Sequence, residues 1–144
     1  MINNETPIYL IAIFVAWLGA HAAKYLVSYF GKEKRNFSSM FASGGMPSSH
    51  SATVMSLATV IGLKDGFYSG FFGIAALFAL IVMYDATKVR FSSGEQGLAI
   101  HEIIKEQNSN IKLPKISKGH TLLEVVIGAF LGVVIGMIVF LATK

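Results

Sequence analysis

Residues 120–142 read HTLLEVVIGAFLGVVIGMIVFLA, and this stretch decides the fold class of the chain. After His120 it holds a single charged residue, Glu124, and it is as long as the roughly 20 apolar residues that cross a membrane as a helix. The whole chain has 144 residues and is 53% hydrophobic and only 14% charged, against roughly 25% charged in soluble domains. With a mean hydropathy of +0.60, this composition excludes an ordinary soluble domain.

Three further apolar segments precede this one. The first of them, residues 7–30, begins at Pro7, which suits the first turn of a helix, and is followed by Gly31, which suits a helix end. No basic region precedes it, so we do not expect it to be a cleaved signal peptide. The stretch from Gln96 to Glu106 mixes isoleucine and charge, which predicts a short amphipathic helix at the membrane interface. We therefore predict an all-α fold, an integral membrane four-helix bundle in one domain (1–144), with helices at about 7–30, 48–63, 67–89 and 120–142 and polar loops at 31–47 and 90–119.

The basic residues are distributed unevenly between the two ends of this predicted bundle. The loops at 31–47 and 90–119 and their flanks hold most of the Lys and Arg residues, whereas only Lys64 and Lys144 flank the helices at the opposite end. The positive-inside rule then predicts a multi-pass protein of the plasma membrane with these loops in the cytoplasm and both termini outside. The net charge of +4 is explained in this way without a nucleic-acid partner.

Two further features bear on assembly and on chemistry. Gly128, Gly132 and Gly136 form a small-residue stripe at four-residue spacing, which suits close helix packing either within the chain or between two copies. The chain has no cysteine, so disulfides, thiolate metal sites and cysteine nucleophiles are excluded.

Polar and ionisable residues gather where the predicted helices meet the two polar loops. Such residues at the edge of membrane spans are costly and indicate function. Up-and-down topology brings four helix ends together: Lys24 and His21 close the first helix, Ser48, Ser49 and His50 open the second, Asp85, Lys88 and Arg90 close the third, and His120 and Glu124 open the fourth. Taken singly, His21 is interpreted as a packing residue and His101 as a solvated loop residue.

The spacing of these residues indicates phosphate chemistry. His120 and Glu124 lie four residues apart on one helix face, so the carboxylate can hold one imidazole nitrogen and leave the other to attack or bind. The glycines before Ser48 and a new helix N-terminus offer backbone N–H groups to an anion. A metal site built from His50, His120, Asp85 and Glu124 is the alternative, but the surrounding cations favour an anion.

The motifs also resemble a known family. The run Gly44-Gly45-Met46-Pro47-Ser48-Ser49-His50 resembles the second signature of the type 2 phosphatidic acid phosphatase (PAP2) superfamily, which is related to acid phosphatases and vanadium-dependent haloperoxidases. The runs from Val82 to Ala86 with Val89-Arg90, and from Gly119 to Thr121 with Glu124-Val125, resemble its divergent branch. The resemblance covers most of the chain, from Lys24 to Gly132, and implies a shortened PAP2-like core of about four helices in place of six.

The resemblance implies a role for each matching residue. His120 would be the nucleophile that becomes phosphohistidine, with Glu124 orienting it, and His50 would be the acid that protonates the leaving oxygen. Lys24 and Ser48 would bind the phosphate. From their place in the predicted cluster, and not from the resemblance, we also expect Ser49, Gly45, Arg90 and Lys118 to bind phosphate and Asp85 to support the site. The chain departs from the family pattern at two cations, because the Arg-Pro of the first signature is missing and Pro114 stands where the third signature has arginine.

These observations predict a membrane phosphatase that hydrolyses a lipid or isoprenoid phosphate or diphosphate, with membrane lipids as its surroundings and no metal or other cofactor. A degenerate, non-catalytic lipid-phosphate-binding protein is the main alternative, and it is motivated by the missing arginines. A vanadate-dependent oxidase and a small transporter are weaker alternatives. The sequence leaves both a monomer and a homodimer open.

Overall fold

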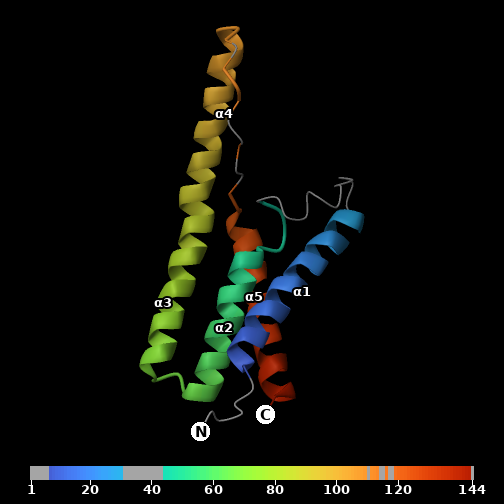
Figure 1. Ribbon diagram of the computed structural model, residues 1–144, viewed down its shortest axis with the longest axis vertical. Helices are drawn as coiled ribbons and strands as arrows, with labels where there is room; N and C mark the ends of the chain where they lie inside the picture. Colours follow the sequence, from blue (N-terminus) through green and yellow to red (C-terminus); the bar gives the residue numbers. More distant parts are fainter. Residues whose placement is uncertain (1–6, 31–43, 110, 114–115, 117–118, 144) are drawn as a thin grey trace.

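The computed structural model describes residues 7–30, 44–109, 111–113, 116 and 119–143, and its regular secondary structure is all helical, with no strand in these ranges (Figure 1). This confirms the predicted all-α fold. In chain order the elements are α1 (Ile8–Phe30), α2 (Ser49–Asp65), α3 (Gly70–Tyr84), a π-helical turn η2 (Asp85–Val89), α4 (Arg90–Glu106) and α5 (Leu122–Ala142).

Within the described ranges, three helical segments are long and apolar enough to cross a membrane: α1, the continuous helix Gly70–Glu106, and α5. The predicted helix at 48–63 corresponds to α2, which has only 17 residues and carries several hydroxyl side chains, and it is not among the three. Helix α2 lies in the middle of the bundle and contacts α1, α3 and α5, so its serine side chains are covered by the other helices (Figure 1).

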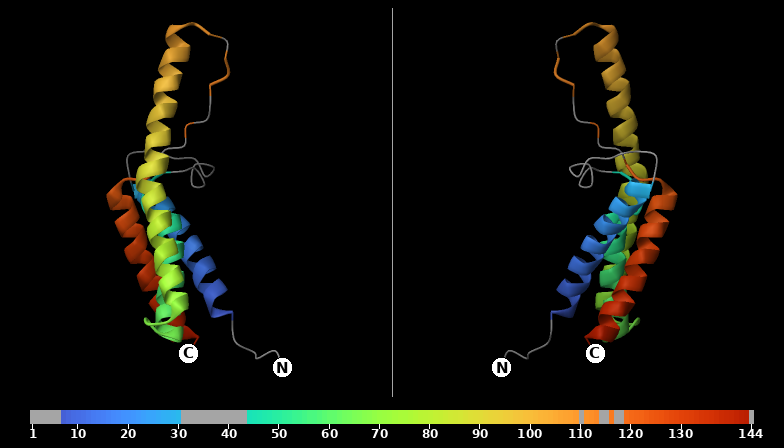
Figure 2. Two further views of the ribbon diagram at one scale, coloured as in Figure 1. Left: turned by 90° about the vertical axis from the view of Figure 1, so that its left-hand side faces the viewer. Right: turned by 90° about the vertical axis from the view of Figure 1, so that its right-hand side faces the viewer.

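The structure corrects the predicted polar loop at 90–119. Residues of α4 are helical as far as Glu106, and they continue the line of α3 well beyond the bundle (Figure 2). The amphipathic stretch from Gln96 to Glu106 is therefore the end of a 37-residue helix, not a separate helix lying along the interface. The sequence misled here because charge ends a membrane span but does not end a helix, and residues 85–106 contain no proline.

The contact between α2 and α5 brings the two backbones very close together. The buried glycines of α5 face backbone atoms of α2: a β-carbon at Gly128 would collide with the Ser48 carbonyl, one at Gly132 with the Ala52 carbonyl, and one at Gly136 would lie 2.8 Å from the Ser56 carbonyl. The glycine stripe therefore packs within the chain, which answers the open question about its partner. It is consequently unavailable as a contact between two copies.

Helix α1 packs on α2 through a stripe of small side chains. Ile8, Ala12, Ala16 and Ala20 are buried at four-residue spacing. The Ser56 hydroxyl donates to the Ala12 carbonyl across this contact at 3.2 Å, which satisfies a hydroxyl group buried in the bundle. Lys24 continues the same stripe and is also buried, so this face of α1 leads from the packed core directly to a cation.

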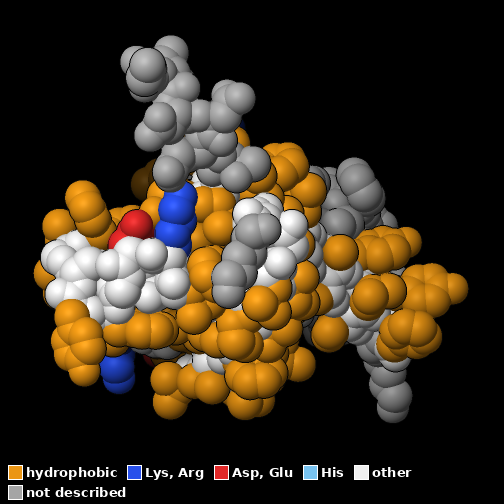
Figure 3. All heavy atoms as spheres, turned by 90° about the horizontal axis from the view of Figure 1, so that it is seen from below, with side chains coloured by type: hydrophobic (Ala, Val, Ile, Leu, Met, Phe, Trp, Pro, Cys, Tyr) orange, Lys and Arg blue, Asp and Glu red, His pale blue; other side chains and the backbone are white. Residues whose placement is uncertain are grey.

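The outer surface of the bundle is apolar. Large hydrophobic side chains on α3 and α5 are more than half exposed, for example Phe71, Leu80 and Phe130. At the end where α1 begins and α5 ends, the described side chains are mostly hydrophobic, with few Lys, Arg, Asp or Glu among them (Figure 3). Contact of such a surface with lipid chains costs no free energy, whereas its contact with water is unfavourable.

We expect Gly132→Ala to destabilise the protein by about 1–3 kcal/mol, since the new methyl group meets the Ala52 backbone. Thermal unfolding of the purified protein in detergent measures this. Gly73→Ala is the matched control, because Gly73 lies on α3 and a β-carbon added there would have nothing within 4 Å. Helix propensity alone makes that change neutral or stabilising by about 0.5–1 kcal/mol. Equal behaviour of the two variants would contradict the packing described here.

Candidate functional site

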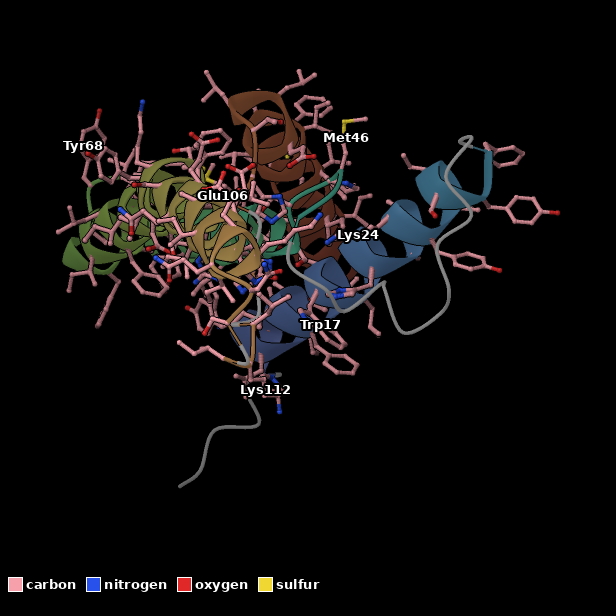
Figure 4. The ribbon with its side chains drawn as sticks, turned by 90° about the horizontal axis from the view of Figure 1, so that it is seen from above. Trp17, Lys24, Met46, Tyr68, Glu106 and Lys112 are labelled. Carbon is pink, nitrogen blue, oxygen red and sulfur yellow. The ribbon has the colours of Figure 1, made fainter. Side chains whose placement is uncertain are left out.

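Four elements meet at one end of the bundle. These are the N-terminal ends of α2 and α5, the π turn η2, and the turn of α1 that carries Lys24. Viewed along the bundle from this end, Lys24 points from α1 toward α2 and α5, whereas Trp17 lies on the outer side of α1 (Figure 4). The predicted convergence of polar residues therefore occurs in the structure.

His120 and Glu124 form a hydrogen-bonded pair at the start of α5. The His120 Nδ1 atom lies 3.0 Å from Glu124 Oε2, and the His120 side chain is only 6% exposed. The same carboxylate oxygen accepts the Thr121 N–H at 3.1 Å, while the Thr121 hydroxyl accepts the Glu124 N–H, which completes a capping box. The cap fixes the carboxylate, and the carboxylate in turn holds Nδ1, so Nε2 is the nitrogen left for chemistry.

The electrostatic surroundings favour neutral His120. Burial lowers the pKa of His120 below its usual value of 6.5, and the hydrogen bond and charge of Glu124 partly oppose this. The charges of Lys24 and Arg90 lower the pKa further. A neutral imidazole with Nδ1 protonated carries its lone pair on Nε2, which is the form that a nucleophile requires.

The segment before α2 is shaped by glycine. Gly44 and Gly45 have φ of 96° and 88°, a region that side chains with a β-carbon rarely adopt. Ser48 then caps α2 and accepts hydrogen bonds from the Ser51 N–H and hydroxyl, and its own N–H donates to the Glu124 carbonyl at 3.1 Å. The main chains of the two helix N-termini are thus joined at the level of the His120–Glu124 pair.

The structure places the predicted phosphate-binding serines in the interior. Ser48 is completely buried and Ser49 is 6% exposed. The described contacts of Ser48 are those of a helix cap. Gly45 lies in the turn that leads to this cap and is half-buried. Lys118 and Pro114 lie outside the described residues.

The π turn supplies Asp85, and the first residue of α4 is Arg90. The Arg90 Nε atom donates to Asp85 Oδ2 at 2.6 Å, and both side chains are partly exposed. The Ala86 carbonyl accepts the His120 N–H at 3.0 Å, and Gly119 packs directly against the backbone at Arg90 and Phe91. These contacts dock the chain that enters α5 onto the long helix.

His50 occupies the centre of the charged cluster. It is exposed, and the charges of Arg90, His120, Lys24 and His21 all act on it. The sequence places His21 at this end but interprets it as a packing residue. In the structure it is a buried neighbour of the cluster, with Nδ1 2.8 Å from the Trp17 carbonyl and its ring against the Trp17 ring. Its position three residues before Lys24, on the same helix face, is the sequence signal that points to it.

The arrangement has the character of an anion site. It combines imidazoles, a lysine, an arginine and a helix N-terminus, all of which favour negative charge. In the ranges that the structure covers, no group of three or more His, Asp or Glu side chains is placed to hold a metal ion.

The comparisons with known proteins agree with this architecture. A family model described as "Divergent PAP2 family" matches residues 5–135, so the chain belongs to the divergent PAP2 family. It is also 31% identical over 144 residues to a Bacillus subtilis (strain 168) protein named "Uncharacterized membrane protein YuiD", covering 90% of this chain and 91% of that one. No solved structure matches. Together with the three apolar helices, these relatives identify a membrane protein of this family.

We expect Glu124→Gln to lower the pKa of His120 further, because the variant loses the carboxylate charge that opposes the effect of burial. Titration of the histidine ring signals by NMR measures this shift. The wild-type protein, measured in the same way, is the control. A rise in the pKa of His120 would contradict the role assigned to Glu124.

Proposed function

We propose that this protein is a membrane phosphatase that hydrolyses a phosphorylated lipid or isoprenoid through a phosphohistidine intermediate. The single observation that carries the proposal is the His120–Glu124 pair, in which a buried imidazole is held at Nδ1 beside two cations. Membership of the divergent PAP2 family supports the same chemistry.

The first step is attack on phosphorus by Nε2 of His120. A nitrogen–phosphorus bond forms and the bond from phosphorus to the lipid oxygen breaks, while His50 donates its proton to that oxygen. The negative charge of the bound phosphate favours the protonated form of His50 that this step needs. The positive charge that appears on the His120 ring is offset by the Glu124 carboxylate.

The second step releases the enzyme. Water attacks phosphorus, His50 takes the proton from that water, and the nitrogen–phosphorus bond breaks to give inorganic phosphate and neutral His120. Lys24, Arg90 and the backbone N–H groups at the start of α2 stabilise the charge on the equatorial oxygens in both steps.

The position of the site supports a lipid substrate. A helix that enters the membrane at Gly70 leaves it after about 20 residues, so Arg90 lies near the membrane boundary and α4 projects beyond it. An apolar groove of about 670 Å³ lies between α3 and α5 and reaches Thr87 and Leu122, close in the chain to Ala86 and His120. A phosphate at this level would leave its chain within the membrane.

A non-catalytic phosphate-binding protein is the second candidate, and burial of Ser48 favours it. In the family pattern this serine contacts phosphate, whereas here its hydroxyl is enclosed and bonded to Ser51. Such a protein would bind a phospholipid headgroup saturably and release no phosphate.

Phosphate release decides between the two candidates. We expect the purified protein to release phosphate from polyprenyl or glycerolipid phosphates in the presence of EDTA. His120→Ala should reduce this to background, since no nucleophile remains, and His50→Ala should reduce it strongly. His101→Ala is the matched control and should keep full activity. Full activity of His120→Ala would refute the mechanism, and saturable binding without turnover by the wild-type protein would establish the second candidate.

We also propose that the site faces the cytoplasm of cells whose plasma membrane holds the protein. In the described ranges Lys88, Lys105 and Lys112 belong to α4 and its flanks, at the end of the bundle that holds the site, whereas Lys64 lies at the opposite end, in the last turn of α2. The positive-inside rule favours the cytoplasm for the end with more cations.

Because the chain has no cysteine, a single Glu102→Cys substitution on exposed α4 reports on sidedness. We expect an impermeant maleimide to label it only after the cells are opened. Tyr68→Cys, in the turn between α2 and α3, should be labelled in intact cells. The reverse pattern would place the site outside.

A further inference from the structure

The long helix changes its hydrogen-bond register where it passes the site. The Arg90 N–H donates to the Asp85 carbonyl, five residues back, whereas in an α-helix it would donate to the Ala86 carbonyl, four residues back. The Ala86 carbonyl instead accepts the His120 N–H at 3.0 Å. The π turn therefore frees one acceptor of the helix for the residue that bears the proposed nucleophile.

The side chains of the turn complete its hydrogen bonding. The Thr87 hydroxyl lies 3.0 Å from the Met83 carbonyl and 3.2 Å from the Tyr84 carbonyl, where the wider turn loosens the regular ladder. Asp85 holds Arg90 at its Nε. In an α-helix, residues five apart point about 140° away from each other, so this pairing also depends on the wider turn.

The turn is fixed from the other side as well. Gly119 packs against the backbone at Phe91 so closely that a β-carbon would collide with it, and Ala86 is 3% exposed. The main chain of His120 is thus held at both ends, by Ala86 before α5 begins and by the capping box of α5 itself.

We propose that the π turn of residues 85–89 positions His120 for attack, with Thr87 as a positioning residue that stabilises the turn. The reasoning is geometric: the extra residue leaves a helix carbonyl free at the level of the site, and that carbonyl sets the height of the imidazole relative to Arg90 and His50. This inference rests on the proposed function for its effect on rate, but the hydrogen bond itself can be tested without activity.

Deletion of Lys88 tests the inference directly. Removing one residue from a π turn restores α-helical register while the flanking helices keep their orientation, so backbone N–H groups reclaim the Ala86 carbonyl. Lys88→Ala is the matched control, because it removes the same exposed side chain but keeps the residue count. We expect the amide of His120 to exchange with solvent much faster in the deletion variant, and to remain protected in the wild type and in Lys88→Ala.

The rate of phosphate release gives the second readout. We expect the deletion to lower kcat about 10²-fold, as a misplacement of about 1 Å does, with KM changed by less than about threefold. The melting temperature should fall only modestly, because one buried hydrogen bond is lost. Thr87→Val should show a smaller loss of kcat that Thr87→Ser restores, and it stands in for the deletion if that variant does not fold. Lys88→Ala should keep wild-type kcat.

The outcomes separate the two proposals. Absence of phosphate release from the wild-type protein would refute the proposed function, while fast exchange at His120 in the deletion variant would still support the docking role of the turn. An equally protected His120 amide in the deletion variant would overturn the inference. So would wild-type kcat in a deletion variant whose His120 amide has become exposed.

Discussion

The close contact between the backbones of α2 and α5 is the constraint on which the rest of this structure depends. Glycines at 128, 132 and 136 allow the Ser48, Ala52 and Ser56 turns to touch the α5 backbone without intervening side chains. Lipid chains are as apolar as leucine, so membrane helices gain from tight packing rather than from escape from water. One consequence is register: the Ser48 N–H meets the Glu124 carbonyl, so the N-terminus of α2 lies beside the first turns of α5.

From this register the site follows with few additional parts. Each helix N-terminus needs a cap, and the cap of α5 uses the Glu124 carboxylate that also holds His120. One carboxylate thereby caps a helix and orients an imidazole. The third contribution comes from the long helix, whose π turn offers the Ala86 carbonyl to His120 and pairs Asp85 with Arg90.

Lys24 brings a charge to the edge of the apolar bundle. Lys24 is 6% exposed, yet it ends a stripe of alanines that packs on α2, so its aliphatic part continues the core while its charge reaches the cluster. Around it stand the imidazoles and the Asp85–Arg90 pair. The phosphate of the proposed substrate would offset the positive charge gathered there.

The sequence by itself determined the all-α membrane fold, the family, and the gathering of His50, His120, Lys24 and Arg90 at one end, because hydrophobic length and helix order are local properties. The His120–Glu124 pair was also predictable, since residues four apart share a helix face. Only the tertiary structure decided that the glycines pack within the chain and that Ser48 is enclosed. The continuation of α3 through a π turn into α4 likewise escaped the sequence. The π turn is stabilised by the hydrogen bond between the Ala86 carbonyl and the His120 N–H, and these two residues are far apart in the sequence.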